Sequence, residues 1–157
     1  MTAGRLSDLR AAFDQDGDRR LWDEGWAALA ARVPDGAPRP RVYIEEFRCP
    51  PKAAGGWVPD MVRIAGGEPF LTPPGSGDWE VSWEEMMEFD PQLVLLLGLD
   101  RAPEEWMAIE GWDRVEAARE GRIYSVEGKP FSAPGLDLLD GGRLLQALIG
   151  EAFWGWP

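Results

Sequence analysis

The sequence contains no histidine and only one cysteine, and these two shortages exclude many kinds of active site. Without histidine the chain cannot form a Ser-His-Asp triad, a zinc site with His ligands or an axial His ligand for heme iron. Cys49 has no second cysteine with which to form an internal disulfide, and a single thiolate does not make a metal site. We therefore expect no catalytic residues, no metal site and no resident cofactor.

Long apolar runs are also missing. The longest strongly apolar run, Leu93–Leu97, is far too short to cross a bilayer, so no membrane insertion is predicted. Met1–Leu9 carries Arg5 and Asp8 and has no apolar centre, so it does not resemble a signal peptide. From these residues alone a cytoplasmic location stays open.

Positive charge is scarce: 16 Lys and Arg stand against 28 Asp and Glu, and the formal net charge is −12. Such a surface repels phosphate backbones and anionic lipids, so nucleic acid is not expected as a partner, whereas a basic protein surface is. The length of 157 residues, with 45 % hydrophobic and 28 % charged residues, fits one globular domain.

The hydrophobic pattern alternates between helical and strand periods. Residues 1–35 show helical spacing, and residues 41–153 are expected to form an α/β lobe in which strands alternate with helices. The predicted strands are Arg41–Phe47, Leu93–Leu97 and Arg122–Val126, and the unbroken apolar run of the second is typical of a strand buried on both faces. The expected fold is a single three-layer Rossmann-like lobe, with a mostly parallel central sheet flanked by helices.

One helix start can be predicted from its capping residues. Ser82 followed by Glu85 forms a capping box, in which the side chain of each residue accepts a hydrogen bond from the free backbone N–H of the other. Glu84 is then left without a structural partner close to the positive end of a helix.

In a parallel sheet of this kind ligands bind beyond the carboxyl ends of the strands. The loops expected there are Arg48–Gly56, Gly98–Ala102 and Glu127–Gly135, with the segment Gly75–Trp79 nearby. The candidate ligand-binding residues in or beside these loops are Trp57, Asp78, Trp79 and Phe131. The ring of Phe131 has two readings that the sequence does not separate, because it either stacks on a flat ligand or packs into the core. No role is assigned to Cys49, or to Trp154 and Trp156 in the tail.

Three phrases in fixed order carry a family resemblance: Arg41–Gly67, Val81–Leu97 and Gly111–Gly141. They resemble the carboxy-terminal lobe of the cobalamin-binding and iron-complex-binding receptors of ABC importers, the periplasmic substrate-binding proteins of the helical-backbone type. Two positions depart from the usual phrases of that family. Gly56 stands where a His is common, and Leu136-Asp137 stands where Pro-Arg is usual.

The resemblance implies a non-catalytic substrate-binding lobe for cobalamin or another metal chelate, located in the periplasm or outside the cell. It implies that Glu84 docks to the ABC permease, and that residues 1–35 correspond to the helix linking two lobes. Since only one lobe is expected, the exposed cleft face could pair with a second copy as a homodimer. The alternative is a stand-alone protein-interaction module that kept the lobe fold and lost its ligand. An enzyme that uses Asp78, Glu80 and Glu84 ranks last, because no base, nucleophile or cofactor motif accompanies them.

Overall fold

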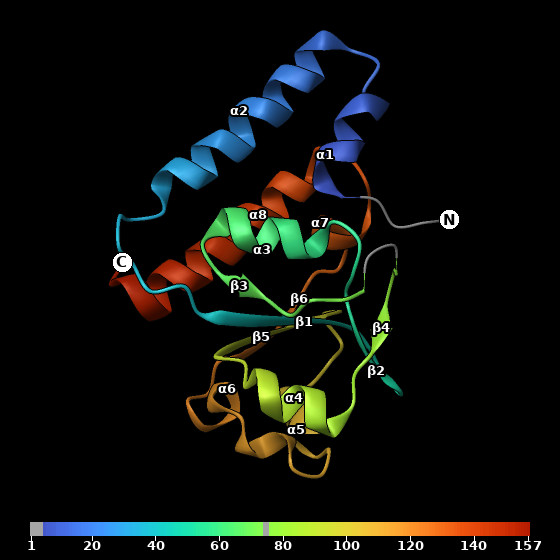
Figure 1. Ribbon diagram of the computed structural model, residues 1–157, viewed down its shortest axis with the longest axis vertical. Helices are drawn as coiled ribbons and strands as arrows, with labels where there is room; N and C mark the ends of the chain where they lie inside the picture. Colours follow the sequence, from blue (N-terminus) through green and yellow to red (C-terminus); the bar gives the residue numbers. More distant parts are fainter. Residues whose placement is uncertain (1–4, 74–75) are drawn as a thin grey trace.

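A twisted six-stranded sheet crosses the middle of the computed structural model, which describes residues 5–73 and 76–157 (Figure 1). The strand order is β4-β2-β1-β5-β6, and β3 pairs with β1. The strand bounds are β1 Arg41–Arg48, β2 Pro51–Ala53, β3 Glu68–Pro69, β4 Trp79–Glu80, β5 Leu93–Leu97 and β6 Ile123–Val126. Residues 1–4 of the predicted helical segment and Gly75 of the predicted loop Gly75–Trp79 lie outside the described residues.

The sheet is mixed, so the predicted α/β fold is confirmed while its mostly parallel character holds only in part. Strands β3, β1, β5 and β6 pair in parallel, whereas β2 and β4 add to the other edge in antiparallel fashion. Strand β2 lies inside Arg48–Gly56, so the prediction of a loop over this whole segment is wrong. Its register with β1 shifts between Glu45 and Phe47. The hydrophobic pattern of the sequence does not predict this irregularity.

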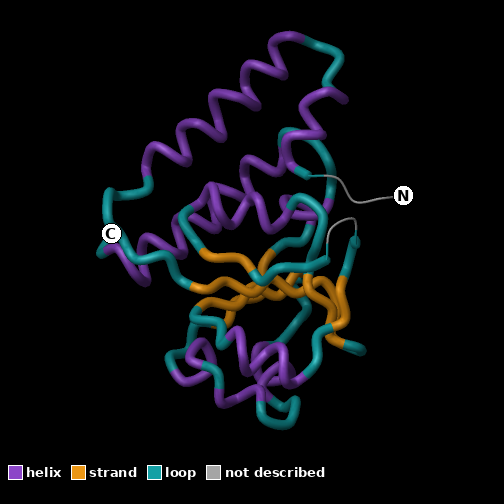
Figure 2. The backbone as a smooth tube through the Cα atoms, in the orientation of Figure 1, coloured by secondary structure: helices purple, strands orange, loops and turns teal. Residues whose placement is uncertain are grey.

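Helices cover both faces of the sheet and form three layers (Figure 2). One face carries α3 (Val58–Ala65), α7 (Lys129–Ser132) and α8 (Asp137–Ile149), with α1 (Leu6–Leu9) and the long α2 (Asp16–Arg32) beyond them. The other face carries α4 (Trp83–Phe89), α5 (Pro103–Met107) and α6 (Glu116–Arg119). Turns of 3-10 helix at Arg10–Ala12 and Trp112–Arg114 and a π-helical turn at Gly150–Trp154 complete the secondary structure of the described residues. Among those residues, no helix combines the length and the apolar character that a membrane crossing requires.

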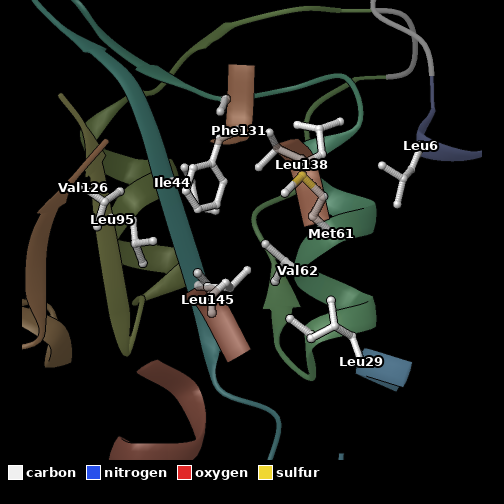
Figure 3. Close-up of a cluster of buried hydrophobic side chains, with 14 of the residues drawn as sticks. Leu6, Leu29, Ile44, Met61, Val62, Leu95, Val126, Phe131, Leu138 and Leu145 are labelled. Carbon is white, nitrogen blue, oxygen red and sulfur yellow. The ribbon is translucent and has the colours of Figure 1, made fainter. Parts of the chain in front are cut away.

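Each face of the sheet has its own hydrophobic core. Strand β5 is buried along its whole length, as predicted, and sends alternate side chains into the two cores. In the core under α3 and α8, Ile44, Met61, Phe131 and Leu138 point toward one another (Figure 3). The other core is rich in aromatic residues and includes Tyr43, Phe70, Trp106 and Trp112, whose rings pack edge to face or tilted.

Local sequence signals explain where the helices begin and end. Ser82 and Glu85 form the predicted capping box of α4, with Glu85 N–H donating to Ser82 Oγ at 3.1 Å. Helix α3 has Pro59 in its first turn and ends at Gly66, whose φ of 108° is left-handed. Helix α8 leaves Leu144 37 % exposed, and two glycines of its buried face, Gly141 and Gly142, lie against neighbouring elements.

Helices α7 and α8 approach too closely to admit a side chain at Gly141. A Cβ there would lie 2.2 Å from the carbonyl oxygen of Pro130, an atom that cannot move without moving the backbone. We expect Gly141→Ala to lower the free energy of unfolding by about 1–3 kcal/mol, because α7 must shift. Gly17→Ala is the control, since Gly17 lies in α2 with open space around it. That change should stabilise the protein by about 0.5–1 kcal/mol. Urea denaturation of both variants measures whether the free energy of unfolding falls in the first and rises in the second.

Candidate functional site

Loops from four parts of the chain meet in a hollow of about 160 Å³ beyond the carboxyl end of β1. Four segments form its floor: the end of β1, the start of α3, the α7 segment after β6, and the residues just before β4. The lining includes Glu46, Trp57, Asp78, Phe131 and Ser132, together with the small residues Ala54, Gly55, Gly56, Val58 and Gly77. We call this hollow the floor pocket. It lies at the end of the sheet where ligands bind in parallel α/β folds.

Three of the four predicted ligand-binding residues, Trp57, Asp78 and Phe131, therefore line one pocket. Gly55 explains how the Asp78 segment comes so close. A Cβ on Gly55 would lie 1.8 Å from the carbonyl oxygen of Gly77, so only glycine allows the two backbones to pass at this distance. Trp57 is partly exposed, and its indole N–H donates to the Phe131 carbonyl at 2.8 Å, which fastens the start of α3 to α7.

Phe131 contributes backbone to the pocket, while its ring belongs to the core. The residue is 1 % exposed, and its ring points toward Ile44, Met61 and Leu138 (Figure 3). Of the two readings that the sequence left open, the structure therefore shows core packing. The buried ring is not placed to stack on a flat ligand, so Trp57 provides the aromatic wall of the floor pocket.

Trp79 lies in a wider hollow of about 800 Å³ that adjoins the floor pocket at Gly56. Its indole N–H donates to Glu85 at 3.0 Å, which links the end of the connecting segment to the capping box of α4. Other lining residues are Arg5, Pro59, Asp60, Arg63, Leu71, Thr72, Pro73 and Ser76. The aromatic pair Trp57 and Trp79 thus borders one continuous hollowed face.

Glu46 is the most strongly perturbed group of the floor pocket, and sequence reasoning missed it. Partial burial raises the pKa of its carboxyl above the usual value, and the nearby charge of Asp78 raises it further. Arg101 and Ser132 act in the opposite direction and do not cancel the effect. The doublet Glu45-Glu46 at the end of a strand was the available signal, but strand alternation alone does not say which member faces the ligand side.

The other member of the doublet, Glu45, is fully buried in the aromatic core. Its carboxylate accepts hydrogen bonds from the Tyr43 hydroxyl at 2.8 Å and the Trp106 indole N–H at 3.2 Å, and it forms an ion pair with Arg101. Burial raises the pKa of Glu45 in spite of these partners, and it raises the pKa of Tyr43 well above its usual value. Tyr43 is therefore committed to this network and is not available as a metal ligand.

Glu84 is exposed on the first turn of α4, at the same end of the sheet as the floor pocket. Neighbouring Glu85 is held by Ser82 and Trp79, which leaves Glu84 as the acidic side chain presented outward by this turn. Trp83 beside it is 45 % exposed and covers Gly111, where a Cβ would lie 1.9 Å from the indole nitrogen. The geometry is compatible with the predicted docking role of Glu84 and does not test it.

The structure gives packing roles to the tail tryptophans. Trp154 donates to the Pro38 carbonyl at 2.8 Å and lies against Gly66, and Trp156 packs edge to face on Trp154 beneath the Arg32 guanidinium. These contacts lie at the end of the sheet opposite the floor pocket. Cys49 is a free, exposed thiol.

Residues 21–130 match the sequence family described as periplasmic binding protein. This is more than half of the chain, and the match contains β1, α3, α4, β5 and most of the floor pocket. The chain belongs to the periplasmic binding protein family. Membership in a family of binding proteins agrees with the prediction that the chain is not an enzyme. No curated protein matches the chain in sequence.

Solved structures of the same fold are similar to most of the chain. An ABC transporter substrate-binding protein from Listeria monocytogenes matches 91 % of this chain with a TM-score of 0.71 and 16 % identity. IsdE of S. aureus complexed with heme matches 91 % with a TM-score of 0.70 and 19 % identity. An ABC-type Fe3+-hydroxamate transport system from Saccharomonospora viridis matches 96 % with a TM-score of 0.71 and 19 % identity. The chain spans 61, 61 and 57 % of these three proteins, respectively.

The buried ion pair should be costly to break from one side. We expect Arg101→Ala to lower the free energy of unfolding by about 3–5 kcal/mol, because Glu45 is then left buried without its charged partner. Arg48→Ala provides the control, since Arg48 forms a more exposed ion pair with Glu105 at 3.5 Å. Losing such a surface pair costs less than about 1 kcal/mol. Equal losses in urea denaturation of the two variants would contradict the structural role of Glu45.

Glu46 should make stability depend on pH. Because its pKa is raised in the folded chain, its favourable contribution is present below the ordinary glutamate pKa and is lost as the pH rises through the folded value. Glu46→Gln removes this loss, so the variant should gain stability relative to the wild type between about pH 4 and pH 7. Thermal unfolding across that range measures the difference. Parallel curves for the two proteins would show that Glu46 ionises as a solvated side chain.

Proposed function

We propose that the chain is the carboxy-terminal, substrate-binding lobe of an ABC-importer receptor for a metal chelate, with cobalamin as the leading candidate. The observation that carries the proposal is the floor pocket, which lies at the ligand end of a lobe belonging to the periplasmic binding protein family. Family membership also supports a periplasmic or extracellular location. The heme and hydroxamate proteins of similar fold support the broader class of chelate ligands.

A chelate suits the shape and chemistry of this face better than a small solute does. The floor pocket and the wider hollow adjoin at Gly56, and together they offer a broad surface bordered by Trp57 and Trp79. Flat, largely apolar ligands are held by aromatic walls with a few polar groups that fix their orientation. The conjugated ring of a corrinoid or porphyrin has this character.

The lobe is proposed to form one half of a clamp. The chain spans 57 to 61 % of the three solved proteins described above, so in each of these a large part has no counterpart in this chain. A ligand held from one side only keeps much of its surface in water. Losing one wall of a closed pocket should forfeit several kcal/mol, which weakens binding by roughly three decades. We also propose that the uncovered face can pair with a second copy of the chain, a state that light scattering would detect.

The aromatic wall should decide chelate binding. We expect the chain to bind cyanocobalamin weakly, and we expect Trp57→Ala to weaken this binding by about tenfold or more, because the aromatic wall of the floor pocket is lost. NMR titration of the indole N–H signals suits weak affinities. Trp83→Ala is the matched control, since Trp83 lies on α4 and outside both hollows. Equal weakening by the two changes would place the ligand elsewhere.

Glu84 is proposed to dock to a basic surface of the ABC permease. We expect Glu84→Arg to abolish association with the permease and to change the melting temperature very little, because the side chain is exposed. Glu120→Arg makes the same change of charge at an exposed position on the opposite end of the sheet, and it should leave association intact. Light-scattering or pull-down measurements with the purified permease provide the readout. A large loss of stability in Glu84→Arg would instead make Glu84 a structural residue.

A further inference from the structure

The floor pocket carries two ionisable side chains among the described residues that line it, and both are carboxylates, Glu46 and Asp78. We infer that this lobe selects a ligand that presents hydrogen-bond donors or positive charge to it, such as amide N–H groups, and that it discriminates against ligands that present carboxylates. The inference rests on the proposed function and concerns the charge class of the chelate. It assigns Glu46 and Asp78 as specificity-determining residues.

The two carboxylates come from different elements and converge on one space. Glu46 extends from the last part of β1, and Asp78 lies just before β4, at the point where Gly55 lets the two backbones pass. They are near enough for the charge of Asp78 to disfavour ionisation of Glu46. Within residues 5–73 and 76–157, neither side chain forms an ion pair.

The nearby cation does not serve the pocket. Arg101 reduces the effect on Glu46, but its guanidinium is engaged with the side chain and the carbonyl oxygen of Glu45, with the latter hydrogen bond at 3.0 Å. The Ser132 hydroxyl donates to the Gly128 carbonyl at 3.0 Å, and it also lies close enough to Glu46 to lower the pKa of that carboxyl. The carboxylate oxygens of the pocket therefore have acceptor capacity that a bound ligand can use.

The surrounding face does not reverse this preference. The wider hollow contributes Arg5 and Arg63 against Asp60 and Glu85, which adds no net formal charge, and Arg63 is already paired with Asp60 at 3.0 Å. The whole chain carries a net charge of −12, so the long-range field also opposes an anionic ligand.

A ligand that covers the pocket also removes water from the carboxylates. An ionised carboxylate that loses its water is costly unless a donor or a cation replaces the water. The propionamide groups of cobalamin supply neutral N–H donors, whereas the propionates of heme add further negative charge. Between two ligands with the same ring system, the pocket therefore favours the amide over the carboxylate.

The test compares ligands that differ only in this group. The chain is titrated with cyanocobalamin and with its monocarboxylate, in which one propionamide is hydrolysed, while the indole N–H signals are followed by NMR. A second pair is gallium protoporphyrin, a diamagnetic stand-in for heme, and its diamide. We expect the amide member of each pair to bind about tenfold more tightly at low salt, with the ratio falling as salt is added.

Isosteric neutral variants identify the residues responsible. In the double variant Glu46→Gln, Asp78→Asn the ratio of the affinities for the amide and the carboxylate member of each pair should fall toward one. Glu80→Gln removes an exposed carboxylate that lies outside the floor pocket, and it should keep most of the preference. Melting curves check that each variant is folded.

The outcomes separate the two proposals. Equal binding of both members of each pair, tighter binding of the carboxylate members, or a preference unchanged in the double variant overturns the inference and leaves the proposed function standing. Failure of all four ligands to bind overturns the proposed function, and the inference falls with it.

Discussion

Glu45 places a carboxylate in the aromatic core at the carboxyl end of β1, where two other elements and a second residue of β1 are bound to it. Arg101 holds the loop after β5, Trp106 holds α5, and the Tyr43 hydroxyl closes the network from the same strand. Because the carboxylate is fully buried, each of these donors offsets part of a large desolvation cost. The loop after β5 therefore has a fixed position, and the ligand end of the sheet is built on this anchor.

The anchor also determines what Glu46 can do. Successive residues of a strand face opposite sides of the sheet, and although the register with β2 shifts at this point, Glu45 enters the aromatic core while Glu46 faces α3 and α7. There it meets Asp78 across the floor pocket, and Arg101 is already engaged by the first carboxylate. Two adjacent glutamates thus have different roles: one organises the fold and the other gives the pocket its charge. The same alternation would exchange these roles if the register of β1 moved by one residue.

The sequence was sufficient for features that depend on local chemistry. The capping box at Ser82 and the apolar run of β5 each have one physically favoured reading, and the structure confirms them. The order of the family phrases correctly indicated the periplasmic binding protein family. Features that depend on contacts between distant segments were not predictable in this way. Strand β2 forms from three residues, too few to show a period, and its hydrogen bonds come from pairing with β1 on one side and β4 on the other.

The candidate site shows the same division. Trp57 and Asp78 could be placed near the ligand end because each follows or precedes a recognisable element, and both line the floor pocket. The ring of Phe131 could not be placed, since its direction depends on where α8 packs, and α8 packs closely against α7 because Gly141 leaves room for the Pro130 carbonyl. Glu46 was overlooked for a related reason. Its pKa is raised first by burial and then by the charge of Asp78, which is 32 positions away in the sequence and is brought near by a glycine that lets two backbones pass. A pocket whose charge is set by such a contact can change its ligand class through substitutions that leave the hydrophobic pattern, and therefore the fold, unaltered.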